Sequence, residues 1–75
     1  MKDFIKVTTK RFIEVTTKNR TYLLNVKHIE DVWKDKDGKC TIFFEFNIPG
    51  AVEHDYIIPR ESYDEVMRMI KEAMG

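Results

Sequence analysis

Apolar residues alternate with polar ones through much of the chain before Pro59, and helical spacing replaces this alternation after it. The alternation is typical of β-strands that bury one face. It predicts strands over residues 12–17, 21–26, 32–33, 40–46 and 54–58. Since 75 residues allow one small domain, we expect an α+β fold. Its form would be an antiparallel meander of four to five strands, with one C-terminal helix packed on one face.

The helix after Pro59 is indicated by its first turn. Ser62 followed by Glu65 matches a capping box, in which the two residues satisfy each other's backbone N–H groups. One apolar stripe at helical spacing follows. Its members are Tyr63, Val66, Met67, Ile70, Ala73 and Met74.

Two turns are marked by glycine. Asp37-Gly38 lies between apolar runs and predicts a hairpin turn in which both residues tolerate positive φ. Pro49-Gly50 predicts the centre of the longest loop, over residues 47–53. The segment of residues 27–31 is short and mostly polar, so we expect a helical turn or a bend there.

The N-terminal region repeats one strand pattern. FIKVTTK at residues 4–10 returns as FIEVTTK at 12–18, with Glu14 in place of Lys6. Only one copy is needed to complete the meander. We expect a single domain over 1–75 in which residues 1–10 form a silent arm, an extra edge strand, or a strand donated to a partner molecule.

Charge is balanced overall but divided along the chain. Residues 1–20 carry six basic and two acidic side chains, and residues 21–75 carry seven and eleven. This division indicates either a solvated strand face or a basic arm attracted to an acidic neighbour, such as another copy of the chain.

The cysteine count and the lengths of the apolar runs indicate the cellular compartment in which the protein is expected. The single cysteine, Cys40, excludes an internal disulfide and lies in an apolar run, which predicts a buried thiol. The start of the chain lacks the apolar region of a signal peptide, and no apolar run has the length of a membrane span. We therefore expect a cytoplasmic protein that does not enter a membrane.

From the sequence we expect that the protein is not an enzyme. We assign no catalytic, cofactor-binding or metal-binding residues. The candidate metal ligands do not form a known spacing motif, and we expect two surface histidines. These candidates are His28, Asp31, Cys40, His54 and Asp55. The one serine, Ser62, is explained by the helix cap, and three glycines form no phosphate-binding loop.

Several aromatic residues are predicted to face away from the helix. If Ile13 and Val15 face inward, Phe12 faces outward, and Phe43 does so if Phe44 faces inward. Apolar side chains gathered on an uncovered sheet face indicate a contact surface. The predicted surface consists of Phe4, Phe12, Phe43 and Trp33, with Tyr56 as a further candidate. It suggests a non-catalytic interaction module that forms a homo-oligomer, most simply a homodimer.

Nucleic-acid binding is the alternative. Basic residues interleave with Phe4, Phe12 and Tyr22, and a sheet with such residues can stack single-stranded bases. The basic residues are Lys6, Lys10, Arg11, Lys18 and Arg20. A small regulator that binds nucleic acid through its first twenty residues would fit this pattern.

The stretches FIEVTTKNRTYLLNVKHIEDVW and YIIPRESYDEV cover much of residues 12–72. They resemble small FlbD-type flagellar and motility proteins in their strand–turn–strand start, their Ile29-x-x-Val32 step and their Glu61-Ser62 helix entry. The chain is more loosely similar to LytTR-like DNA-binding domains and to uncharacterised Bacteroides-type bacterial proteins. These resemblances imply a β-rich domain.

Overall fold

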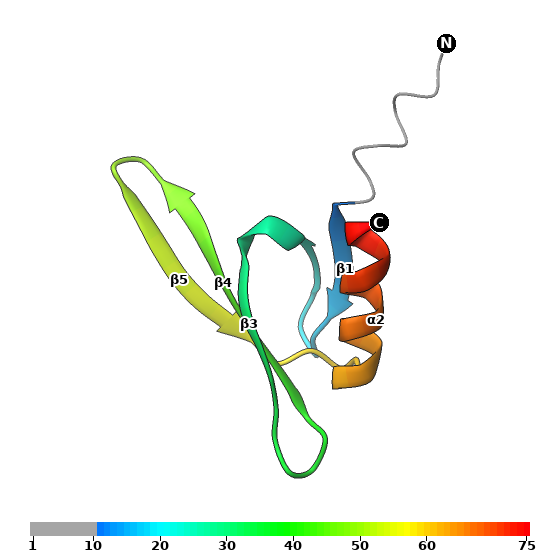
Figure 1. Cartoon of the computed structure of the whole chain (residues 1–75). Coiled ribbons are helices and arrows are strands. Elements are labelled where there is room, and N and C mark those ends of the chain that lie inside the picture. The colour runs from blue at the N-terminus through cyan, green and yellow to red at the C-terminus, as the bar shows by residue number, and fades with distance from the viewer. Residues whose placement is uncertain (1–10) are drawn as a thin grey trace.

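The computed structural model describes residues 11–75, which form five antiparallel strands and one C-terminal helix (Figure 1). This confirms the α+β class. The elements are β1 (Phe12–Thr16), β2 (Thr21–Asn25), the 3-10 turn η1 (Val26–His28), β3 (Ile29–Lys34), β4 (Cys40–Ile48), β5 (Ala51–Ile57) and α2 (Tyr63–Met74). The expected extra strand at residues 4–9 lies outside the described residues.

The strands form two sheets rather than one continuous meander. β1 pairs with β2, and β3, β4 and β5 form a second sheet in that order. The division occurs at η1, where the Asn25 side chain accepts a hydrogen bond of 2.9 Å from the Lys27 N–H. This turn redirects the chain, so β3 follows β2 without pairing with it (Figure 1).

The β4–β5 hairpin is longer than the sequence predicts, and the predicted loop over residues 47–53 is wrong. The strands continue to an Ile48–Ala51 pair, so that only Pro49 and Gly50 remain in the turn. Gly50 has a φ of +83°, which matches the third position of a type II turn that has proline at its second position. Both faces of this hairpin are exposed to solvent near its turn. The sequence there therefore lacks the alternation of apolar and polar residues that indicates a strand with one buried face.

The predicted turn at Asp37-Gly38 is confirmed, with a different geometry. Gly38 has a φ of +87°, whereas no non-glycine residue of the described chain has a positive φ. The Gly38 N–H donates to the Asp35 carbonyl at 3.0 Å, and the Asp35 carboxylate accepts from the Asp37 and Lys39 N–H groups, each at 2.9 Å. These bonds fit a type I turn followed by a left-handed glycine.

The core lies where α2 packs against both sheets (Figure 1). Its buried residues are Ile13, Val15, Leu24, Cys40, Ile42, Ile57, Val66 and Ile70. The predicted helix stripe contributes Val66 and Ile70, whereas Met74 at its end is 73% exposed. Cys40 is buried as predicted, and this burial raises the pKa of its thiol.

The predicted capping box at the start of α2 is present. The Ser62 hydroxyl accepts from the Glu65 N–H at 3.2 Å, and the Glu65 carboxylate accepts from the Ser62 N–H at 2.8 Å. Ser62→Ala should therefore lower the free energy of unfolding by about 1 kcal/mol. Urea denaturation would measure this loss. Ser62→Asp is the matched control, because aspartate also caps helices well, and equal losses in both variants would contradict the capping role.

Candidate interaction surface

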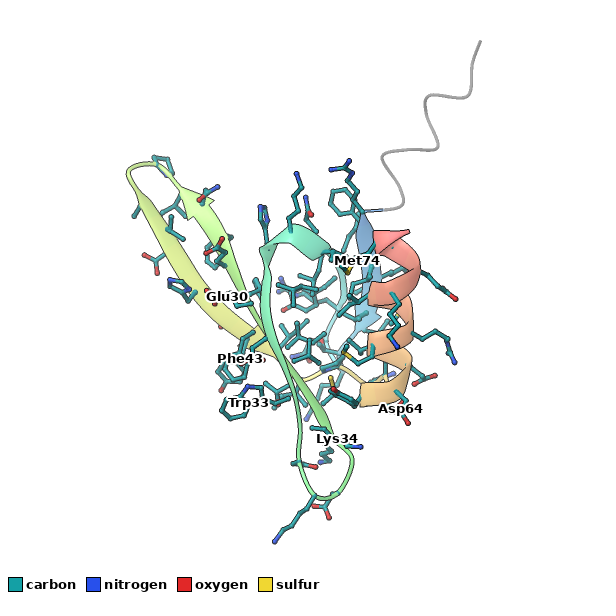
Figure 2. The ribbon with its side chains drawn as sticks, viewed as in Figure 1. Glu30, Trp33, Lys34, Phe43, Asp64 and Met74 are labelled. Carbon is teal, nitrogen blue, oxygen red and sulfur yellow. The ribbon has the colours of Figure 1, made fainter. Side chains whose placement is uncertain are left out.

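The three-stranded sheet has one face covered by the core and one face open. In β4 the alternation turns Ile42 inward, where it is fully buried, and turns Phe43 and Glu45 to the opposite side. Figure 2 shows Trp33 and Phe43 pointing away from α2. We call this open side of β3, β4 and β5 the outer face.

Three rings cross the outer face, one from each strand, and we call Trp33, Phe43 and Tyr56 the aromatic row. The ring centroids of Trp33 and Phe43 are 5.1 Å apart, and those of Phe43 and Tyr56 are 5.7 Å apart. These tilted contacts lie within the favourable range for aromatic pairs. Trp33 is 59% exposed and Tyr56 55% exposed, so the row presents a large apolar area to solvent.

Asp31 holds the ring of Trp33, which lies at one end of the aromatic row. Its carboxylate accepts a hydrogen bond of 2.9 Å from the indole N–H of Trp33, two residues further along β3. The only polar atom of the indole is therefore satisfied within the chain, and the apolar part of the ring remains open for contact.

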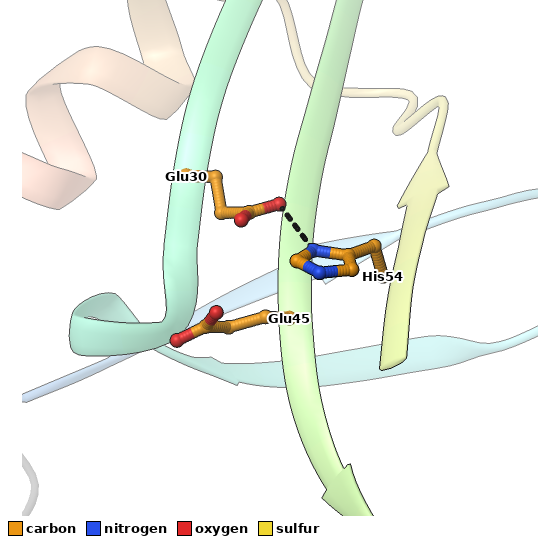
Figure 3. Close-up of side chains that lie close together, drawn as sticks. All are labelled: Glu30, Glu45 and His54. Carbon is orange, nitrogen blue, oxygen red and sulfur yellow. Dashed lines mark hydrogen bonds and ion pairs between the residues drawn. The ribbon is translucent and has the colours of Figure 1, made fainter. Parts of the chain in front are cut away.

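A polar cluster of Glu30, Glu45 and His54 adjoins the aromatic row (Figure 3). Glu45 and His54 are directly opposite on β4 and β5, while Glu30 lies at a register shift between β3 and β4. The shift inserts one residue into the ladder and directs the Glu30 side chain across β4. Its carboxylate oxygen lies 3.1 Å from the Nδ1 atom of His54.

The electrostatics of this cluster favour a charged imidazole. The hydrogen bond and the charge of Glu30 raise the pKa of His54, and the charges of Glu45 and Glu53 add to this effect. Carboxylate oxygens and an imidazole nitrogen are ligand types that zinc accepts, and the three side chains bring one such atom each within 4.8 Å of the others. Because the His54 side chain is 61% exposed and already paired, we interpret the cluster as a surface ion pair.

The structure brings together two of the four residues predicted for the interaction surface. Trp33 and Phe43 are in contact, and Tyr56 completes their row. Phe12 lies on β1 in the other sheet, so the prediction that it shares a face with Phe43 is wrong. It is 37% exposed. Phe4 lies outside the described residues.

Sequence reasoning did not connect Glu30 and Glu45 with His54. The three residues are distant in the chain and meet only through the pairing of β3 with β4 and of β4 with β5. The cross-strand pair of Glu45 and His54 could have been found from the hairpin register, once the turn at Pro49-Gly50 was known to contain two residues.

Three basic residues of the alternative hypothesis are described by the structure, and they lie at opposite ends of β1. Arg11 precedes this strand, whereas Lys18 and Arg20 lie in the turn that follows it. The strand has five residues, so these ends are about 17 Å apart. The Arg20 guanidinium lies 5.8 Å from the ring centroid of Tyr22. Lys6 and Lys10 lie outside the described residues.

Comparison of the chain with protein-family models, curated proteins and solved structures gives no match. The resemblance to FlbD-type and LytTR-like proteins therefore stays a prediction. Among residues 11–75, no helix has the length and apolar character needed to cross a bilayer.

Proposed function

We propose that this chain is a non-catalytic, cytoplasmic interaction module that associates with a second copy of itself through the outer face. The aromatic row is the observation that carries this proposal. Trp33, Phe43 and Tyr56 form a continuous apolar strip on a sheet face that α2 leaves uncovered. Exposed aromatic clusters of this kind are typical of the centres of protein interfaces.

A second copy suits this face because a two-fold axis can bring the two aromatic rows together and keep like charges apart. Glu30 and Glu45 lie on one side of the aromatic row. Beyond the other side of the row, the turn that precedes β4 carries Lys36 and Lys39 together with Asp35 and Asp37. A two-fold axis near Phe43 would place the aromatic row of each copy on that of the other and would keep the two pairs of Glu30 and Glu45 at opposite ends of the interface.

Trp33→Lys should shift the protein from dimer to monomer in sedimentation equilibrium, because the charge would be forced into the centre of the interface. Trp33 is exposed, so the substitution should leave the fold intact. Leu23→Lys is the matched control, since Leu23 is 66% exposed on the other sheet and should retain the dimer. The native chain has a single tryptophan, so its emission should move to shorter wavelength as the protein concentration rises.

A monomeric native chain, or equal effects of the two lysine variants, would contradict self-association through the outer face. The nucleic-acid alternative makes a different prediction. A random single-stranded oligonucleotide would then bind with an affinity that falls steeply with salt. Arg20→Ala would weaken that binding, whereas Trp33→Lys would not.

A further inference from the structure

The ion pair in the polar cluster of Glu30, Glu45 and His54 leaves one carboxylate without a partner. The ion pair joins only Glu30 and His54. Within residues 11–75, no hydrogen bond or ion pair involves the Glu45 carboxylate, although this side chain is half-buried. The cluster therefore has two carboxylates and at most one positive charge, and the carboxylates repel each other. A divalent cation would balance the charge of both.

We propose that Glu30, Glu45 and His54 form a zinc-binding site on the outer face. One carboxylate oxygen from each glutamate and one imidazole nitrogen would be the protein ligands, and a water molecule would complete a tetrahedral site. The ion would take the place of the proton between Glu30 and His54, so the same side chains serve either as an ion pair or as zinc ligands.

The distances between the ligand atoms fit zinc. Zinc binds carboxylate oxygen and imidazole nitrogen at about 2.0–2.2 Å, which places neighbouring ligand atoms of a tetrahedral site about 3.3 Å apart. The Glu30 oxygen and the Nδ1 atom of His54 are 3.1 Å apart. All three ligand atoms lie within 4.8 Å of one another. Two ligands therefore already have the required spacing, and a change in the side-chain torsions of Glu45 would bring the third into range.

The paired strands hold the three side chains in this arrangement (Figure 3). Glu45 and His54 are directly opposite on β4 and β5, and Glu30 lies at the register shift between β3 and β4. Ligands on strands are positioned more precisely than ligands on loops. Because each ligand comes from a different strand, the site forms no spacing motif in the sequence, and the sequence gave no reason to expect it.

Isothermal titration of the full chain with zinc chloride would test the proposal, and we expect one zinc ion per chain. His54→Ala and Glu45→Gln should each weaken zinc binding at least about 10-fold, since even partners outside the ligand set contribute about 10–100-fold. Nitrogen NMR of the imidazole rings gives a second measurement. Zinc should shift the ring signals of His54 and leave those of His28, which is outside the cluster, in place.

Glu53→Gln is the matched control for Glu45→Gln. Glu53 adjoins His54 on β5 and lies outside the cluster, so this variant removes an equal charge without removing a ligand. It should retain most of the zinc affinity. Equal losses in the two variants, or no zinc binding by the native chain, would overturn the proposal.

Magnesium chloride gives a further test, because magnesium prefers oxygen ligands and should bind far more weakly than zinc. Equal affinity for both ions would contradict a site that depends on the imidazole. Half a zinc ion per chain would also contradict the proposal, since it would indicate an ion shared between two copies. The inference does not rest on self-association, because all three ligands belong to one chain.

Discussion

Ile42→Ala is expected to lower the free energy of unfolding by about 2–5 kcal/mol. Ile42 is fully buried at the centre of its sheet, directly opposite Val32 on β3 and Ile57 on β5. Removing its side chain leaves a cavity that three paired strands cannot readily fill. A domain of this size has a total stability of about 4–11 kcal/mol, so the variant should lose a large part of its stability.

Ile48→Ala is the matched control for this substitution. Ile48 lies on the same strand and is 41% exposed, so little buried contact is lost. Its effect should stay below about 1 kcal/mol, since surface substitutions are usually small. Urea denaturation followed by circular dichroism would measure both variants. Equal losses would contradict the placement of Ile42 in the core and of Ile48 at the exposed end of the same strand face.

Glu61→Ala is expected to cost about 1–3 kcal/mol, because it leaves a partly buried backbone group without its partner. One Glu61 carboxylate oxygen accepts from the Thr16 N–H and the other from the Thr16 hydroxyl, each at 2.9 Å. The Arg60 N–H donates to the Thr16 carbonyl at 2.7 Å. These bonds tie the end of β1 to the segment that precedes α2. Thermal or urea denaturation of the variant would test the contribution.

The same carboxylate should make part of the stability dependent on pH. Burial raises the pKa of Glu61, but the hydrogen bonds from Thr16 and from its own backbone, with the charge of Arg60, hold it below its usual value. The stabilisation is therefore fully present above the pKa of the unfolded chain, about 4.3. It is lost as the pH falls through the lower pKa of the folded state.

Glu61→Ala should remove this part of the acid sensitivity, whereas Glu72→Ala should not. Glu72 is exposed on α2 and lacks a side-chain hydrogen bond within the described residues, so its replacement should change stability by about 0.5 kcal/mol or less. A native profile of stability against pH in Glu61→Ala would contradict the role assigned to this carboxylate.

Features set by neighbouring residues could be predicted from the sequence. The Ser62–Glu65 capping box depends on two residues three positions apart, and the turn at Gly38 requires a residue that tolerates positive φ. The separation into two sheets could not be predicted in this way. It depends on how η1 directs β3, and the alternation of each strand is the same whichever sheet it joins.

The outer face could be predicted only in part, because alternation within one strand shows only which residues share a side of that strand. Once Ile42 is assigned to the core, alternation alone places Phe43 on the opposite side. Alternation does not show which strands are neighbours, and this led to the incorrect grouping of Phe12 with Phe43. It also fails at Glu30, because an inserted residue changes the period locally.

The open edge of β5 has a consequence for how the sheet can grow. β5 ends the order β3-β4-β5, so one side of its backbone pairs with no strand among residues 11–75. Antiparallel pairing of two copies centred on His54 would set Glu53 of each directly opposite Asp55 of the other. Like charges in this position are destabilising. The acidic sequence of β5 therefore acts as a barrier against edge-to-edge polymerisation, which limits association at this edge while the outer face stays open.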